Sequence, residues 1–378
     1  METLSVPQGS FQLGRFPRRK REQLRAWDAA DEYLLTHTAE ETLLNEESRV
    51  LIVNDQFGAL AVSLHENNPV SISDSWIAHL GTLENQKDNQ LAEDAITLED
   101  SLTYPNESFD LILLKVPKSL AMLEDQLIRL RPILEKGGRL IAGGMAKNIH
   151  SSTLKLFEKY IGPTHTSLAQ KKARLIFPQI DEALATQDSP YPSAYTLENT
   201  DYKIINHAAV FSRDSLDIGT RFLLQHLPKS DGYKTVVDLG CGNGVAGLIC
   251  AAQNPSAELI FTDESFMAVA SAKANFTAAF NQTRQAKYKV TDCLQGIAPN
   301  SADLIINNPP FHQQNAVGDF IALQMFRESY KTLRQRGELW VIGNRHLGYH
   351  TRLKKLFGNC ETVASNKKFV ILKAVKTA

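Results

Sequence analysis

The sequence predicts an α/β protein made of two tandem domains, each built around a doubly wound, mostly parallel sheet. Apolar, strand-like runs alternate with helix-like segments throughout the second half, and this alternation is typical of parallel sheets that helices cover on both faces. The first half shows the same order of segments more faintly. The 378 residues are too many for one typical core and are enough for two.

The second half starts its regular pattern with an apolar strand, a glycine loop and a helix over residues 235–255. A second strand and helix are expected over 257–276. Further strands are expected at 287–294, 302–311, 337–346 and 368–376. An amphipathic helix over 321–337 is expected to end at Gly337, since glycine is common just past a helix. Ligands of such sheets bind beyond the carboxyl ends of the strands.

The first half repeats this pattern in five segments that follow the same order. The corresponding pairs are 48–64 with 235–250, 69–85 with 257–275, 109–119 with 302–312, 130–144 with 333–344, and 150–162 with 349–359. This repetition indicates a duplicated domain; the alternative is that unrelated α/β sheets share one pattern. Residues 181–200 are rich in Pro, Ser and Asp and form the expected linker. We therefore predict one domain over 1–185 and another over 186–378.

The two copies differ at the strand ends, where a ligand would bind. Of the glycine loop, only Gly58 survives in the first copy, and a turn of Asn-Asn-Pro-Pro-Phe is replaced there by Lys115-Val116-Pro117-Lys118. We expect the first domain to be a degenerate duplicate that keeps the fold and has lost the reaction.

Composition excludes several classes of protein. With 43% hydrophobic and 22% charged residues, the composition is that of an ordinary globular protein. Because the net charge is only −1, a nucleic acid would have to bind at local basic patches. The four cysteines form no C-x-x-C pair and no zinc-like cluster, so we expect reduced thiols and no metal. No apolar run suits a signal peptide or a membrane span. We therefore expect a cytoplasmic protein. The sequence contains no coiled-coil pattern and does not determine the oligomeric state, for which a monomer is our guess.

The glycine loop "VVDLGCGNG" places Gly240, Gly242 and Gly244 directly after a strand. Glycines let the backbone come close to a ligand, and the following helix offers free N–H groups. A nicotinamide-type G-x-G-x-x-G pattern fits only loosely, through Gly247. Asp238 before the loop favours an amino-acid-like ligand over a pyrophosphate, because a carboxylate would face its amino end.

Two further aspartates follow the next strands of the predicted sheet. Asp263 ends the second strand, where it could accept hydrogen bonds from ribose hydroxyls, and Asp292 ends the third, near the expected place of an adenine amine. The alternative for both residues is a helix N-cap after a strand.

These strand-end residues, in this order and spacing, resemble the class I S-adenosylmethionine-dependent methyltransferases. The resemblance implies a Rossmann-like fold in both domains, with S-adenosylmethionine as the cofactor. The cofactor-binding residues it implies are Asp238, Gly240, Gly242, Gly244, Asp263 and Asp292.

The turn "NNPPF" at 307–311 ends a buried strand and matches the N-P-P-F/Y signature of enzymes that methylate exocyclic amines or amide nitrogens. An exocyclic amine is a poor nucleophile, because its lone pair is delocalised into the ring. The Asn308 side-chain oxygen and the Pro309 carbonyl can accept its two N–H bonds and stabilise the developing positive charge. Phe311 can stack on the base. The alternative is a rigid turn that only ends the strand.

The whole chain resembles the ribosomal RNA guanine-N2 methyltransferases with tandem methyltransferase domains. The matching stretches are "AWDAADEYLL" (26–35), "LIVNDQFGAL" (51–60), "LLKVPK" (113–118), "VFSRDSLDIGTRF" (210–222), "VDLGCGNGV" (237–245), "NNPPFHQQ" (307–314) and "NRHLGYHTRLKKLFGNC" (344–360). Within that family the sequence is most similar to the branch that acts on large-subunit (23S) RNA. The resemblance implies N2-methylation of one guanine, with a non-catalytic first domain that binds the RNA.

Basic clusters could supply the RNA contacts, although each is also consistent with an ordinary solvated face. They are Arg18-Arg19-Lys20-Arg21, Lys171-Lys172-Arg174, Lys354-Lys355 and Lys367-Lys368, together with Lys115 and Lys118. Three rival functions stay open: a small-subunit (16S) guanine-N2 methyltransferase, a protein-glutamine N5 methyltransferase, and an RNA-binding chaperone with a vestigial methyl site.

Overall fold

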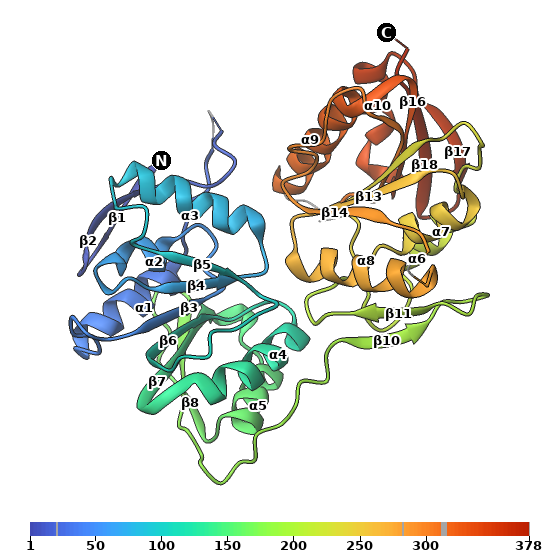
Figure 1. Ribbon diagram of the computed structural model, residues 1–378. Helices are drawn as coiled ribbons and strands as arrows, with labels where there is room; N and C mark the ends of the chain where they lie inside the picture. Colours follow the sequence, from blue (N-terminus) through green and yellow to red (C-terminus); the bar gives the residue numbers. More distant parts are fainter. Residues whose placement is uncertain (20–21, 282, 311–315, 378) are drawn as a thin grey trace. The chain divides into compact units, whose positions relative to one another are not determined.

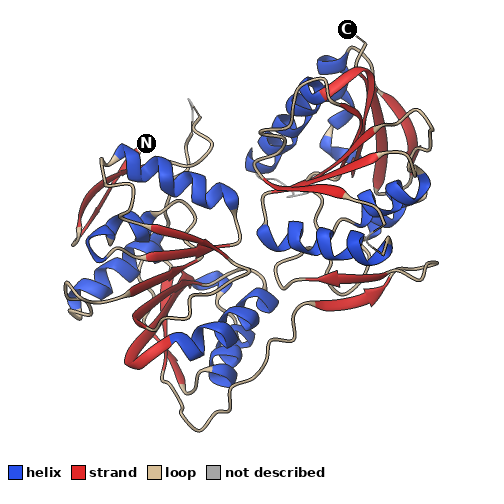
Figure 2. Ribbon diagram, viewed as in Figure 1, coloured by secondary structure: helices blue, strands red, loops and turns tan. Residues whose placement is uncertain are grey.

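The computed structural model describes residues 1–19, 22–281, 283–310 and 316–377. They form two compact units, Met1–Tyr191 and Pro192–Ala378, each with its own sheet and helices (Figures 1 and 2). The division falls inside the segment that the sequence marked as a linker, beside the expected boundary at 185/186.

The second unit contains a seven-stranded sheet in the order β14-β13-β12-β15-β16-β18-β17. Its strands are β12 (Thr235–Leu239), β13 (Glu258–Asp263), β14 (Ala286–Val290), β15 (Ala302–Asn307), β16 (Leu333–Asn344), β17 (Glu361–Ser365) and β18 (Phe369–Val375). The first five run parallel, and β18 lies antiparallel to both of its neighbours. The strand order reverses between β12 and β15, which is where an open α/β sheet of this kind binds its ligand.

Helices cover both faces of this sheet (Figure 1). They are α6 (Ile218–Leu224), α7 (Val245–Gln253), α8 (Phe266–Ala279), α9 (Ala316–Thr332) and α10 (Tyr349–Phe357), with a short 3-10 turn at Arg345–Leu347. The first three share one apolar core, to which Leu223, Cys250 and Phe276 belong. Helices α9 and α10 share the other core, through Phe326 and Leu353. A hairpin of β10 (Ser193–Thr196) and β11 (Lys203–Asn206) packs against α8.

The first unit has the same sheet order, β5-β4-β3-β6-β7-β9-β8, so the predicted duplication is confirmed. Its strands are β3 (Val50–Val53), β4 (Val70–Ser73), β5 (Thr97–Asp100), β6 (Phe109–Lys115), β7 (Leu134–Met145), β8 (Thr164–Thr166) and β9 (Ala173–Pro178). Its helices are α1 (Ala29–Glu40), α2 (Ala59–Ser63), α3 (Trp76–Asp88), α4 (Leu120–Leu130) and α5 (Ser151–Tyr160), with 3-10 turns at His65–Asn67, Arg131–Ile133 and Ala146–Asn148. A further hairpin joins β1 (Glu2–Val6) to β2 (Gly9–Leu13).

Several predicted elements are wrong in their extent. The strands expected at 287–294 and 302–311 end at Val290 and Asn307. Helix α9 ends at Thr332 and not at Gly337, which lies inside β16. A β-carbon on Gly337 would sit 2.9 Å from the Arg334 carbonyl oxygen and 3.0 Å from that of Ala302, so the glycine serves close strand contact and is not a helix cap. The expected linker over 181–200 is also not all loop, because β10 forms within it.

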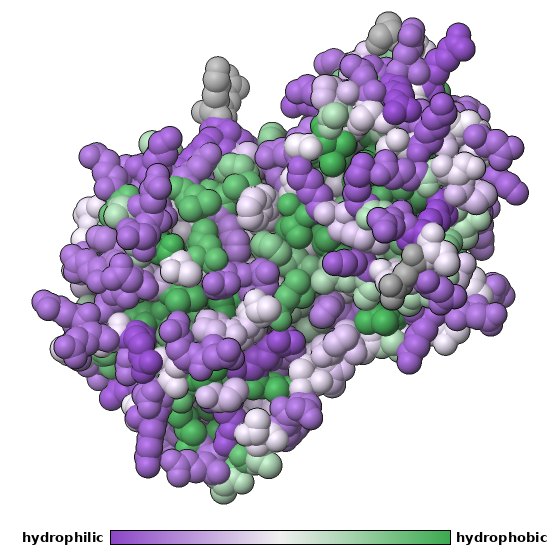
Figure 3. All heavy atoms as spheres, viewed as in Figure 1, coloured by the Kyte–Doolittle hydropathy of each residue, from purple (hydrophilic) through white to green (hydrophobic). Residues whose placement is uncertain are grey.

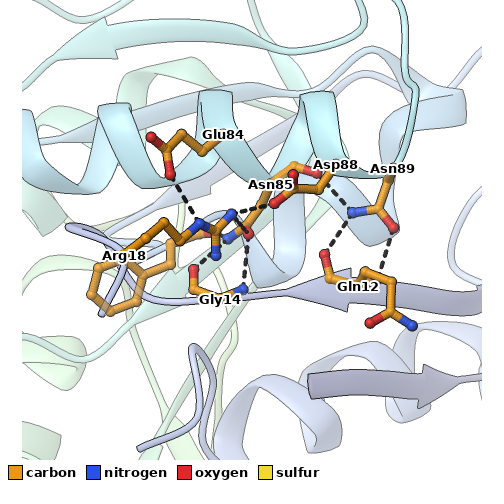
Figure 4. Close-up of polar contacts among 8 residues, drawn as sticks. Gln12, Gly14, Arg18, Glu84, Asn85, Asp88 and Asn89 are labelled. Carbon is orange, nitrogen blue, oxygen red and sulfur yellow. Dashed lines mark hydrogen bonds and ion pairs between the residues drawn. The ribbon is translucent and has the colours of Figure 1, made fainter. Parts of the chain in front are cut away.

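The segment after β2 is fastened to α3 by polar contacts (Figure 4). The Arg18 guanidinium donates to the Glu84 carboxylate at 2.9 Å and to the Asn85 side-chain oxygen at 2.8 Å, and it also pairs with Asp88. The charge of Arg18, which the sequence places in a basic cluster that could contact RNA, is thus matched by acidic residues of its own domain. Lys20 and Arg21 of the same cluster lie outside the described residues.

Candidate active site

The candidate site lies at the carboxyl ends of β12 and β15, the two strands at which the sheet order reverses. Leu239 at the end of β12 pairs with Asn307 at the end of β15. The Asn307 side-chain nitrogen also donates to the Leu239 carbonyl oxygen at 2.9 Å. The glycine loop and the Asn-Pro-Pro turn, which are far apart in the sequence, thus start from neighbouring points of one sheet edge.

The glycine loop connects β12 to α7, and its glycines have different structural roles. Gly240, Gly242 and Gly244 all have positive φ, at +69°, +54° and +76°. A β-carbon on Gly244 would lie 2.7 Å from that of Ala272, so this glycine lets α7 pack on α8. A β-carbon on Gly242 would meet no described atom within 4 Å. Packing therefore does not require a glycine at position 242. The absence of a side chain there leaves the loop backbone open to a ligand.

Asp238 is buried, with an exposed fraction of 3%, and braces the first turn of α7. Its Oδ2 accepts the Gly247 N–H at 2.7 Å. Burial, with a smaller contribution from nearby Asp263, raises the pKa of Asp238 to about 7 against the lowering effect of the Gly247 hydrogen bond. Gly247 must be glycine, because a β-carbon there would lie 2.4 Å from the Phe261 ring. Asp238 is thus a support of the loop.

Asp263 ends β13 and ties the glycine loop to the next strand. One oxygen accepts the Gly242 N–H at 2.9 Å and the other the Ser265 N–H at 3.0 Å. The N-cap of α8 is Ser265, whose hydroxyl accepts from Ala268, so the alternative of Asp263 as the N-cap is wrong. Each carboxylate oxygen has a second lone pair, and further donors such as ribose hydroxyls can still bind.

Asp292 lies just past β14 and is held by two amides rather than by a helix start. The Gln324 side-chain nitrogen donates to its Oδ2 at 2.9 Å, and that of Gln295 donates at 3.2 Å. The N-cap alternative is wrong here as well, since no helix of the described chain begins at this point. Gln324 comes from α9 and was missed in the sequence, because nothing distinguishes one glutamine on an amphipathic helix.

Asn308 follows β15 directly and is half-buried. Its side-chain nitrogen donates to the Thr220 hydroxyl at 3.1 Å. Its Oδ1 is buried and has no hydrogen-bond partner among the described residues. The same holds for the side-chain oxygens of Asn307 and Asn344, which end β15 and β16. A buried acceptor without a donor costs roughly 1–3 kcal/mol, so this sheet edge is suited to a donor from outside the chain.

The other residues of the predicted turn are only partly described. Pro309 is buried and Pro310 is half-buried, directly beyond Asn308. Phe311, predicted to stack on a base, lies outside the described residues. Two exposed apolar side chains, Phe211 and Ile218, belong to the segment that carries Thr220. They are the only exposed large hydrophobic residues of the described second unit. Most side chains on the face shown in Figure 3 are hydrophilic.

Cys241 is a buried residue of the glycine loop. Burial raises the pKa of its thiol well above the ordinary value, and Asp263 and Asp238 raise it further, so it stays protonated and is a poor nucleophile. The described side chains contain no group of three His, Cys, Asp or Glu that could hold a metal ion. Within the same residues, every helix is too short or too polar to cross a bilayer.

In the first unit, the place of Asn308 is taken by Lys115. Leu114 pairs with Val53 at the end of β3, as Asn307 pairs with Leu239, so Lys115 is the next residue in the equivalent position. Its ammonium lies 2.8 Å from an Asp28 oxygen and 2.7 Å from an Asp31 oxygen. Burial alone would lower the pKa of Lys115, but the two carboxylates outweigh it and raise the pKa. Lys115 is 9% exposed, and its prediction as an RNA contact is wrong.

The strand order, the glycine loop and the acidic strand ends define a class I methyltransferase fold. Comparisons with known proteins agree: residues 201–373 match the methyltransferase small domain, and residues 1–182 match the RLMG N-terminal domain. A relative from Streptomyces coelicolor, "Ribosomal RNA large subunit methyltransferase G", is 49% identical over 99% of this chain and 100% of its own. The chain therefore belongs to the ribosomal RNA large subunit methyltransferase G family.

Other relatives have the same printed name. The one from Aeromonas salmonicida is 51% identical over 96% of each chain, and the one from Yersinia enterocolitica is 48% identical over 98% of this chain and 93% of its own. A solved structure, a T. thermophilus 16S rRNA N2 methyltransferase in complex with AdoMet and guanosine, aligns with a TM-score of 0.76 over 99% of this chain and 97% of that one. At 20% identity this likeness concerns the fold.

Proposed function

We propose that this chain transfers a methyl group from S-adenosylmethionine to the exocyclic N2 amine of one guanine in large-subunit (23S) ribosomal RNA. The relatives' printed name supports ribosomal RNA of the large subunit as the substrate. The observation that carries the choice of an amine is the buried Asn308 Oδ1, which has no partner among the described residues. Ribosomal RNA as substrate also implies that the protein works in the cytoplasm.

The chemistry of an exocyclic amine fits this acceptor. The amine lone pair is delocalised into the guanine ring, and an N–H held by the Asn308 oxygen turns that lone pair out of conjugation. A second N–H can be held by the Pro309 carbonyl, whose position two consecutive prolines restrict. Both oxygens stabilise the positive charge that grows on nitrogen as the N–C bond forms. The surplus proton then leaves to solvent, so no general base is required.

The proposed cofactor residues lie at the carboxyl ends of β12, β13 and β14, on the same edge of the sheet as Asn308. S-adenosylmethionine supplies an electrophilic methyl group when bound. Gly242 leaves its loop open, and Asp263 keeps unused lone pairs for hydroxyl donors. Asp292 would accept from an adenine amine beside Gln324. Asp238 would act mainly through the loop, since its described hydrogen bond goes to Gly247.

The first domain is proposed to bind RNA without catalysing the reaction. Lys171 pairs with Glu32, and Lys115 and Arg18 are also paired, so fewer cations remain than the sequence suggested. The exposed cations that support this role are Lys118, Lys172 and Arg174, with Lys354, Lys355, Lys367 and Lys368 in the second domain. Their contacts to phosphate would make binding fall with salt.

The decisive experiment is product mapping. Ribosomal RNA from cells that lack the gene would be incubated with the purified protein and a methyl donor that carries a deuterated methyl group, and digested nucleosides would be analysed by mass spectrometry. We expect label in N2-methylguanosine of 23S RNA. Label in 16S RNA, in another nucleoside, or only in a glutamine-containing protein would overturn the proposal in favour of the corresponding rival.

The role of Asn308 is tested in the same assay. Asn308→Ala removes one acceptor of the amine and should lower kcat by about 100- to 1000-fold while leaving donor binding nearly unchanged. Asn106→Ala, on an exposed loop of the first domain, is the matched control and should have no effect on either quantity. An unchanged kcat in Asn308→Ala would remove the amine-binding role.

A further inference from the structure

A short chain of hydrogen bonds joins the start of α6 to the end of β15. The Asn308 side-chain nitrogen donates to the Thr220 hydroxyl oxygen at 3.1 Å. That hydroxyl lies 3.3 Å from the Asp217 Oδ2, which also accepts the Thr220 backbone N–H at 2.8 Å. Asp217 is the N-cap of α6, so the helix start fixes the position of Thr220.

The direction of these hydrogen bonds is determined by the carboxylate. An ionised Asp217 can only accept, so the Thr220 hydroxyl must donate its one proton to it. The hydroxyl oxygen is then left as an acceptor, and it can face only the NH2 end of the Asn308 amide. The amide oxygen consequently turns to the other side, where it is buried without a described partner. A flipped amide would present its NH2 group to an amine substrate, donor against donor.

The first domain uses the same device for a different purpose. Asp28 caps α1 as Asp217 caps α6, and Asp31 follows it by three residues as Thr220 follows Asp217. There the two carboxylates bind the Lys115 ammonium and neutralise its charge. A helix start that holds the residue after the central strand is therefore common to both domains. In the second domain, the residue three positions after the N-cap is Thr220, which has a neutral hydroxyl. Thr220 binds the nitrogen of the Asn308 amide, and the amide oxygen keeps no described partner.

We propose that Thr220, held by Asp217, is a positioning residue that fixes the Asn308 amide with its oxygen toward the substrate amine. This inference rests on the proposed amine methylation. Thr220 touches neither substrate nor donor in this role; it acts through Asn308. This positioning role also explains why Asn308, at the end of a strand, is paired with Thr220 from a helix nearly 90 residues earlier in the chain.

The test compares Thr220→Val, which keeps the shape and loses the hydroxyl, with Thr220→Ser, which keeps the hydroxyl. We expect Thr220→Val to lower kcat by about 10- to 100-fold, the scale of a small misplacement, with donor affinity and KM for RNA little changed. Thr220→Ser should restore most of kcat. Thr283→Val, which removes another threonine hydroxyl of the second domain, bonded to the Phe280 carbonyl, is the control and should leave kcat unchanged.

A double-mutant cycle separates positioning from a general structural role. If Thr220 acts through Asn308, Thr220→Val should add almost no further loss in an Asn308→Ala background. Full additivity, or a KM effect that Thr220→Ser does not rescue, would overturn the proposal. Thr220→Ala serves if the valine variant does not fold, as judged by its melting temperature. A wild-type product other than an N-methylated amine would instead defeat the proposed function, and the two failures are thereby distinguishable.

Discussion

The two domains share one sheet topology, but different side chains lie at the ends of their central strands. Where the second domain has Asp238, Asp263 and Asn308, the sheet registers place Ile52, Ser73 and Lys115 in the first. The backbone is conserved in part: Asn54 and Gly58 keep the left-handed conformations of Gly240 and Gly244. The two copies thus keep similar turns and differ in the side chains beside them.

The comparison also shows how a disused site is closed. In the first domain, the Asp55 carboxylate accepts the N–H groups of Ala59, Leu60 and Ala61 at the start of α2. Those donors are therefore engaged by the domain itself. The Lys115 ammonium, Asp28 and Asp31 likewise satisfy one another. Lys115 and Asp55 are thus unavailable to a small ligand, because each is paired inside the first domain.

The largest expected effect comes from copying the first domain into the second. Asn308→Lys replaces the spare acceptor by a cation, which Asp217 would attract as Asp28 attracts Lys115. We expect kcat to fall by about 1000-fold, because a positive charge then faces the amine that becomes positive. Single-turnover methyl transfer measures this, with calorimetry of donor binding as the control. A decrease in kcat of less than about tenfold would show that the side chain at position 308 does not account for the difference between the two domains.

The second prediction concerns the stability of the first domain. Lys115→Met leaves two carboxylates without their partner, one of them buried, and should lower the free energy of unfolding by about 3–5 kcal/mol. Chemical denaturation followed through Trp27 and Trp76, the two tryptophans of that domain, measures it. Lys118→Met, at an exposed position nearby, is the matched control and should change it by less than about 0.5 kcal/mol. Equal effects would mean that the ion pairs stabilise nothing.

A third prediction separates packing from ligand access in the glycine loop. Gly242→Ala meets no protein atom, so it should fold with a backbone strain of about 1 kcal/mol and yet weaken donor binding by about 10- to 100-fold. Gly358→Ala has a similarly positive φ and open surroundings at the end of α10, and it should fold with the same strain and bind the donor normally. Calorimetry and melting temperatures compare the two. Normal binding by both variants would show that the loop does not contact the donor.

The last prediction is a pH dependence that both domains should show over different ranges, with a small slope per pH unit. Burial raises the pKa of Asp238 to about 7 and that of Asp55 to about 6, above the ordinary 3.8. Between the ordinary and the raised value the folded state binds the extra proton, so the free energy of unfolding falls as pH rises, by about 1.4 kcal/mol per unit and group. The decrease should end near pH 6 in the first domain and near pH 7 in the second.

Fluorescence of Trp340, the single tryptophan of the second domain, follows its unfolding as a function of pH. Asp238→Asn keeps an oxygen that can accept the Gly247 N–H and removes the titration of this group, so its curve should fall less steeply than the wild-type curve over the same range. A wild-type curve that rises between pH 5 and pH 7 would contradict a raised pKa at Asp238.

Much of the fold could be read from the sequence, because it rests on local patterns. The alternation of apolar strands and helices and the repeated order of segments predicted both sheets. The helix boundary at Gly337 could not be predicted, since the glycine is required by strand packing against the Ala302 carbonyl rather than by a helix end. The same limit applied to the basic clusters: Arg18, Lys115 and Lys171 look free in the sequence and find acidic partners up to 139 residues away.

For the site, the sequence by itself determined which residue types end the strands: the glycines at 240, 242 and 244, the aspartates at 238, 263 and 292, and the Asn-Pro-Pro turn at 308–310. These are short-range features, set by the chain within a few residues. Only the tertiary structure decided how each is held: Asp238 by Gly247, Asp292 by Gln324, and Asn308 by Thr220. Hydrogen bonds between separate elements depend on how the helices pack on the sheet, and a single polar side chain that makes such a bond forms no periodic pattern in the sequence.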